Sequence, residues 1–61
     1  MTNPLKEYLK THSQKELSKK IGLAENSLRN ISRMDEEAIG GIYYESFKKL
    51  RREGIDFDNF I

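Results

Sequence analysis

The sequence predicts an all-α domain, because its apolar residues recur at spacings of three and four and helix-capping residues stand at the boundaries of these stretches. Size is a further constraint. With 61 residues, 36% of them hydrophobic and 34% charged, the chain has enough apolar side chains for one small core. We therefore expect residues 1–61 to form a single bundle of four to five helices.

The first helix is expected to begin at Pro4, with Asn3 as its N-cap. Proline suits the first helical position because its fixed φ is helical and its missing N–H is not needed there. Leu5, Tyr8 and Leu9 follow at i, i+3 and i+4, so they form one apolar stripe over about two turns.

A second helix is expected from Ser13, because Ser13 and Glu16 have the spacing of a capping box. Leu17 and Ile21 lie four residues apart and mark its buried side. Gly22 should end the helix, since glycine adopts the left-handed conformation of a sharp helix exit without strain.

A third helix is expected from about residue 24 to residue 34, with Leu28, Ile31 and Met34 facing the core. Asparagine and serine are poor helix formers, so their presence on the opposite side lowers stability unless they have a function. The polar residues of that side are Glu25, Asn26, Ser27, Arg29, Asn30 and Arg33.

A fourth helix is expected where Tyr43, Phe47 and Leu50 form an apolar stripe, and Gly54 should follow its end. We expect Tyr43 and its neighbour Tyr44 to serve in the core or in an interface rather than as a platform for bases. The basic residues near the end of this helix complement its dipole and only secondarily suggest a nucleic-acid patch. They are Lys48, Lys49, Arg51 and Arg52.

Two segments allow more than one interpretation. Residues 35–37 could be a loop or the acidic first turn of a short helix, which Gly40 and Gly41 would end. The tail, residues 55–61, could be a short helix capped by Asp56 or an extended segment, and we favour the helix.

Charge is distributed unevenly along the chain. Residues 1–34 carry seven Lys or Arg against three acidic residues, whereas residues 35–61 carry four against seven, although the net charge is only +1. Such a chain can present a cationic face to a polyanion, or it can simply have an ordinary solvated surface.

Composition argues against several classes of protein. The chain has no cysteine and a single histidine, His12, so we expect neither a metal site, nor a cofactor, nor enzymatic activity. No apolar run is long enough to cross a membrane, and no secretory segment follows Met1. A reducing, cytoplasmic location fits the absence of cysteine.

The most informative stretch is residues 14–31, where two short helices meet at a glycine turn. A small residue four positions before the glycine allows the helices to cross closely, and apolar residues after it hold the second helix on the core. The spacing rests on Ser18, Gly22, Leu23, Leu28 and Ile31. This pattern resembles the helix-turn-helix of the lambda-repressor-like family, which includes the Cro-type phage regulators. The family usually has alanine where Ser18 stands. Residues 47–57 are similar to the family's fourth helix and the short helix after it.

The resemblance implies a sequence-specific DNA-binding transcription regulator, a Cro-type repressor of phage or mobile-element type, whose third helix enters the major groove and whose binding excludes polymerase. Arginine pairs with guanine, asparagine with adenine, and a carboxylate can accept from cytosine N4. The implied base contacts are Glu25, Asn26, Ser27, Arg29 and Asn30. The implied phosphate contacts are Gln14, Lys15, Lys19 and Arg33, and Lys20 is a further plausible phosphate contact. The alternative for each is an exposed, solvated residue.

The expected partner is double-stranded DNA with an inverted-repeat operator, bound by a homodimer, because one small domain buries too little surface for tight specific binding. The candidate dimer interface is the apolar tail, Ile55, Phe57, Phe60 and Ile61, unless these residues complete the core of the single chain. Two other functions stay open: a protein-binding helix-turn-helix module, such as an antitoxin or an inhibitor, and a structural domain without a nucleic-acid role.

Overall fold

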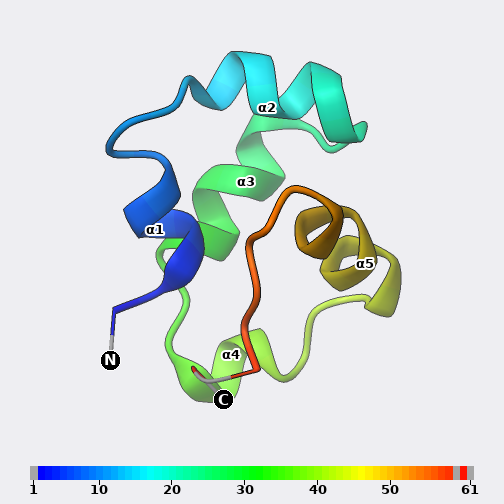
Figure 1. Cartoon of the computed structure of the whole chain (residues 1–61). Coiled ribbons are helices and arrows are strands. Elements are labelled where there is room, and N and C mark those ends of the chain that lie inside the picture. Colours follow the sequence, from blue (N-terminus) through cyan, green and yellow to red (C-terminus); the bar gives the residue numbers. More distant parts are fainter. Residues whose placement is uncertain (1, 59, 61) are drawn as a thin grey trace.

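The computed structural model describes residues 2–58 and Phe60 (Figure 1). This part of the chain contains five helices and no strand, which confirms the all-α prediction. None of these helices is long and apolar enough to cross a membrane. The helices are α1 (Pro4–Tyr8), α2 (Gln14–Ile21), α3 (Glu25–Ser32), α4 (Glu36–Ile39) and α5 (Tyr44–Arg52).

The boundaries of α2 are those that the capping residues predict. The Ser13 hydroxyl accepts a hydrogen bond from the Glu16 amide at 3.3 Å, which is one half of the expected capping box. Gly22 follows the helix with φ 76° and ψ 31°, the left-handed conformation expected of it. α3 ends at Ser32, two residues earlier than expected.

The acidic residues 35–37 were expected to form either a loop or the first turn of a short helix. The structure contains the short helix, α4. The Asp35 carboxylate caps α4 by accepting from the Ala38 amide at 2.9 Å, and the helix ends before Gly40. The aspartate and the acidic first turn both favour a helix N-terminus, and Ile39, which is 0% exposed, packs the short helix on the core.

The helix favoured for the tail is wrong over the part of the tail that the structure describes. Residues 55–58 are not helical, and the Asp56 carboxylate accepts from the Asp58 amide at 2.9 Å in a local turn instead of capping a helix. The tail buries Phe57, which is 3% exposed, and Phe60, which is 7% exposed. The burial of both rings holds the backbone of residues 55–58 in this non-helical conformation.

The core collects side chains from all five helices and from the tail. The tail returns from α5 toward α4 (Figure 1). The Phe57 ring meets the rings of Phe47 and Phe60 edge to face, with centroids 5.8 and 6.1 Å apart. The buried apolar residues are Leu5, Leu17, Leu28, Ile31, Ile39, Leu50, Ile55, Phe57 and Phe60.

Three of the four tail residues considered for pairing therefore lie in the chain's own core. Ile55, Phe57 and Phe60 are each at most 7% exposed, so they offer no apolar surface to a second copy. The fourth, Ile61, lies outside the described residues. The alternative that the tail completes the core of the single chain is the one that the structure contains.

The expected stripe on α5 is correct for Phe47 and Leu50 but wrong for Tyr43. The helix begins at Tyr44, and Tyr43 is its N-cap residue and is 85% exposed. Tyr44 is 73% exposed, so neither tyrosine belongs to the core. Ile42 packs against the core instead, because the residue before the cap can turn inward where the chain enters the helix.

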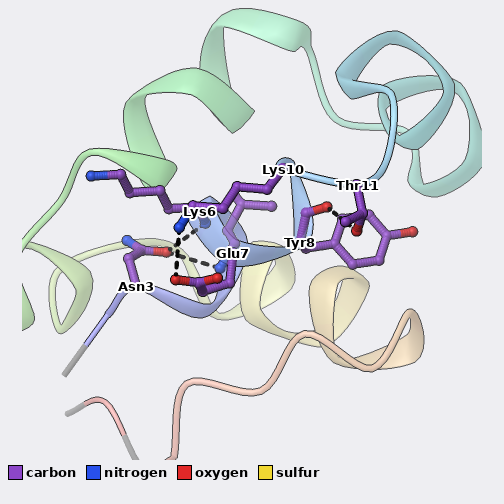
Figure 2. Close-up of polar contacts among 7 residues, drawn as sticks. Asn3, Lys6, Glu7, Tyr8, Lys10 and Thr11 are labelled. Carbon is purple, nitrogen blue, oxygen red and sulfur yellow. Dashed lines mark hydrogen bonds and ion pairs between the residues drawn. The ribbon is translucent and has the colours of Figure 1, made fainter.

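Asn3 makes four hydrogen bonds that join the start of α1 to the end of α3. Its Oδ1 accepts from the backbone amides of Leu5 and Lys6 at 2.9 and 3.3 Å, which caps the start of α1 (Figure 2). Its Nδ2 donates to the carbonyls of Ile31 and Met34 at 2.8 and 3.1 Å, at the end of α3. Asn3 is the buried polar residue of the described chain, only 6% exposed, and one side chain satisfies two helix ends at once.

We predict that Asn3→Ala lowers the free energy of unfolding by about 2–4 kcal/mol, because it removes a cap and leaves two carbonyls without their donor. Asn3→Asp keeps the acceptor but replaces the donor by a charge that the α3 carbonyls repel, so a comparable loss is expected. Urea denaturation measures both. Thr11→Ala, at an exposed hydroxyl just after α1, is the control and should change stability by less than about 0.5 kcal/mol. Wild-type stability in Asn3→Asp would show that the bonds to α3 contribute nothing.

Candidate nucleic-acid interface

α2 and α3 pack against each other and are joined by only three residues, 22–24. The Gly22 amide donates to the Ser18 carbonyl at 3.0 Å, which closes the last turn of α2 before the chain reverses. Leu17 on α2 and Leu28 on α3 are 2% and 0% exposed, so the packing of these side chains fixes the crossing of the two helices.

Side chains bind the backbone carbonyls within this turn. The Ser18 hydroxyl donates to the carbonyl of Leu23, across the turn. Lys49, on α5, donates from Nζ to the carbonyl of Gly22 at 3.4 Å. The sequence interpretation used Ser18 only as a small residue, yet its hydroxyl ties the turn to α2. A serine one turn before a helix-ending glycine has the reach for this bond, so that spacing could have predicted it.

The exposed side of α3 presents one continuous polar stripe. Asn26, Arg29, Asn30 and Arg33 follow the i, i+3, i+4, i+7 spacing of a single helix face, and all four are exposed. The stripe points away from the core because Leu28 and Ile31, on the opposite side, are 0% and 4% exposed. Glu25 and Ser27, also exposed, flank the stripe on either side at the start of the helix.

A groove of about 420 Å³ borders this stripe on one side. Ser27 and Asn30 line it from α3, and Ile42 and Tyr43 line it from the segment before α5. Met34 and other apolar side chains contribute to its lining. The five residues proposed from sequence as base contacts therefore lie together on α3, and Tyr43 adds an aromatic wall beside two of them.

The residues proposed as phosphate contacts divide into two groups. Gln14 is the half-buried first residue of α2, and Lys15 and Lys19 are exposed one turn apart on the same helix. Arg33 lies just beyond the other end of α3, beside a groove of about 660 Å³ that Lys6 also lines. Two carboxylates share that groove, so its positive charge is partly offset. The acidic residues are Asp35 and Glu36.

Lys20 differs from its neighbours on α2 because it has an acidic partner. Its Nζ lies 3.0 Å from the Glu53 carboxylate, just after α5, and the side chain of Glu53 is only 18% exposed. The hydrogen bond from Lys20 to Glu53 raises the pKa of Lys20, and the attraction between the two charges raises it further. The pair links the end of α2 to the residue that follows α5, so Lys20, a plausible phosphate contact from the sequence, has an acidic partner within the fold although 65% of its side chain is exposed.

The single histidine lies in the loop after α1. Its ring stacks on Tyr8 with centroids 3.9 Å apart, and its Nδ1 lies 2.9 Å from the Thr11 hydroxyl. Within residues 2–58 and 60, no three histidine, aspartate or glutamate side chains gather closely enough to hold a metal ion. His12 thus packs on a helix end.

Comparisons of the chain with protein-family models, with curated proteins and with solved structures find no match. The feature of the fold best suited to bind a ligand is α3, a short helix with an exposed stripe of hydrogen-bonding side chains and with hydrogen bonds at both of its ends.

We predict that Gly22→Ala destabilises the domain by about 1–2 kcal/mol, the cost of a left-handed backbone for a residue with a Cβ. The added Cβ would meet only Lys49 Nζ, at 4.0 Å, so the cost is conformational rather than steric. Gly41→Ala is the matched control, because Gly41 does not have a positive φ and its Cβ would make an ordinary contact at 3.5 Å with the Ala38 carbonyl. Thermal unfolding of both variants should show a loss only at Gly22, and equal losses would contradict the conformational explanation.

The Lys20–Glu53 pair predicts a pH dependence of stability. A raised lysine pKa in the folded state stabilises the fold below the ordinary lysine pKa of about 10.4, and the contribution is lost as pH rises through the raised value. The melting temperature of the wild type should therefore exceed that of Glu53→Gln by a small, constant amount between about pH 6 and pH 10 and converge with it above. A difference that persists or grows above that pH would show that Glu53 acts through packing.

Proposed function

We propose that the chain is a sequence-specific DNA-binding transcription regulator, in which α2 and α3 act as a helix-turn-helix of the lambda-repressor-like type. The observation that carries the proposal is the exposed stripe of Asn26, Arg29, Asn30 and Arg33 on a helix whose other side is fully buried. The major groove of DNA, about 12 Å wide, admits one α-helix, so α3 would read base edges there.

The chemistry of the stripe suits base recognition. Arg29 has the planar fork that pairs with O6 and N7 of guanine, and Asn26 and Asn30 have the amide that pairs with N6 and N7 of adenine. Glu25 could accept from cytosine N4. The side chains of Asn26, Ser27 and Asn30 make no hydrogen bond to another described residue, so their donors and acceptors are available to a ligand.

Phosphate binding would come from α2. Gln14 stands at the N-terminus of that helix, where amides and the dipole favour an anion, and Lys15 and Lys19 add positive charge. Arg33 would contact phosphate from the other end of α3. Acting as a repressor, the bound protein would exclude polymerase from a promoter, with no cofactor and no catalytic step.

One domain of this size covers only part of an operator, so two copies would bind an inverted repeat. A two-fold pair would place its two α3 helices about 34 Å apart, which corresponds to half-sites about 10 bp apart. This spacing follows from the helical repeat of DNA and from the symmetry of a homodimer.

We predict that duplexes selected from random DNA contain a preferred site, and that Arg29→Ala binds this site about 1–3 kcal/mol more weakly and relaxes the preference at one base pair. Lys15→Ala is the comparison variant. It should weaken binding to every sequence about equally, because a phosphate contact carries no sequence information. Equal losses on selected and random DNA for Arg29→Ala would reduce Arg29 to a phosphate contact.

Salt dependence tests the class of partner. Binding through several phosphates should weaken steeply between about 50 and 200 mM salt, since neutralised phosphates release counterions. Failure to enrich any DNA sequence, together with a salt-insensitive protein complex, would favour the protein-binding module over the regulator.

A further inference from the structure

A cavity of about 230 Å³ lies between α5 and the tail. One of its walls is a single side of α5, because Tyr44, Phe47, Lys48 and Arg51 follow the i, i+3, i+4, i+7 spacing. Residues 55–58 of the tail form the other wall. The cavity is smaller than the sites of drug-sized ligands, which measure about 300–1,000 Å³, so it suits a molecule of about the size of one amino acid.

The apolar part of the cavity is largely aromatic. Phe57 is 3% exposed and meets the Phe47 ring edge to face, so it supports the lining from below and offers little surface of its own. Tyr44 is 73% exposed and Phe47 is half-buried, so these two rings are the surface that a ligand would cover. Covering them with an apolar or aromatic group removes that surface from water, which favours binding.

The two walls of the cavity carry charges of opposite sign. The wall from α5 carries Lys48 and Arg51, and the wall from the tail carries Asp56 and Asp58. Arg51 and Asp58 pair with each other at 3.1 Å, so each of these charges already has a partner. Lys48 and Asp56 form no ion pair within the described residues. Among those residues, the cavity therefore keeps a cation on one wall and an anion on the other for a ligand.

Both of these charged groups are held in place by contacts within the chain. The Lys48 ammonium lies 5.4 Å from the centroid of the Tyr44 ring, so a cation–π contact places it over another lining residue. The Oδ1 of Asp56 accepts from the Asp58 amide at 2.9 Å, and its Oδ2 has no hydrogen bond to another described residue. A ligand would find the two charges already positioned, which lowers the entropic cost of binding.

We propose that this cavity binds a free amino acid with an aromatic side chain. Its carboxylate pairs with Lys48 and its ammonium with Asp56, while its ring covers Tyr44 and Phe47. The two charges of the cavity select this class of ligand. An aromatic acid would leave Asp56 unpaired, an aromatic amine would leave Lys48 unpaired, and a residue inside a peptide chain has neither α-charge. The site is independent of the proposed function, because no residue of α3 lines the cavity.

Titration of nitrogen-15-labelled protein with L-phenylalanine, followed through the backbone amide shifts, tests the proposal. We expect saturable shifts within residues 44–58 and a Kd of about 1 mM or below, since a ligand of this size makes few contacts. Phenylpropionate lacks the ammonium and phenethylamine lacks the carboxylate, so each should bind at least about fivefold more weakly. Glycine, which has both charges but no ring, should not saturate the site.

Variants of the two charged residues test their roles. Lys48→Gln and Asp56→Asn should each weaken binding of L-phenylalanine at least about fivefold, because each removes one charge. Asparagine keeps an oxygen that can accept from the Asp58 amide, so the local turn is retained. Lys15→Gln, at an exposed lysine on α2, is the matched control and should leave the affinity unchanged.

Tyr44→Ala should also weaken binding, whereas Tyr43→Ala, at a residue that is 85% exposed and does not line this cavity, should not. Circular dichroism of each variant establishes that it is folded. Absence of saturation up to about 10 mM L-phenylalanine would overturn the proposal, as would shifts confined to residues outside 44–58. Equal affinity for phenethylamine or phenylpropionate would overturn it too, because the cavity would then recognise an apolar group alone. Unchanged affinity in both Lys48→Gln and Asp56→Asn would lead to the same conclusion.

Discussion

The arrangement of the domain depends on one buried side chain, the amide of Asn3. A helix end leaves unsatisfied backbone groups, and a chain of this size has few polar side chains with which to satisfy them inside the fold. Asn3 supplies an acceptor to the amides at the start of α1 and a donor to the carbonyls at the end of α3. An asparagine can do both because its side chain carries a donor and an acceptor on one rigid plane. The position of α3 relative to the N-terminus is therefore set by hydrogen bonds as well as by apolar packing.

The other end of α3 is fixed by the turn that precedes it. Gly22 reverses the chain, the hydroxyl of Ser18 binds the Leu23 carbonyl, and Lys49 reaches the turn from α5. A helix of eight residues gains little stability from its own hydrogen bonds, so α3 keeps its shape only because both ends and its apolar side are held. Its outward side is then free to carry Asn26 and Asn30, residues that a helix would otherwise tolerate poorly. Holding the helix at both ends therefore allows a polar, ligand-binding composition on its exposed side.

The sequence predicts what is determined within four or five residues of chain. The caps at Asn3 and Ser13, the exit at Gly22 and the periodicity of Leu28 and Ile31 are such local features, and the structure contains them. The hydrogen bonds from Asn3 to the end of α3 reach Ile31 and Met34, which lie 28 and 31 positions further along the chain. No local sequence pattern encodes contacts over that separation. The prediction of a helix in the tail is wrong for the same reason. An aspartate cap is a local preference, whereas the burial of Phe57 depends on the ring of Phe47. The candidate site on α3 was predictable as a set of residues because helical spacing alone places them on one face, but the groove beside Tyr43 was not.

The small size of the domain also limits how its surface can be used. Once the tail is needed for the core, the large hydrophobic side chains that stay exposed among the described residues are those of Tyr43 and Tyr44. Charge is also placed unevenly on the helices: α2 carries Lys15 and Lys19, and the second half of α5 carries Lys48, Lys49, Arg51 and Arg52. The net charge of +1 conceals both arrangements, since each depends on where the charges lie rather than on their sum. Because α2 and α3 pack against each other, a polyanion attracted to the lysines of α2 would lie close to the exposed hydrogen-bonding side chains of α3.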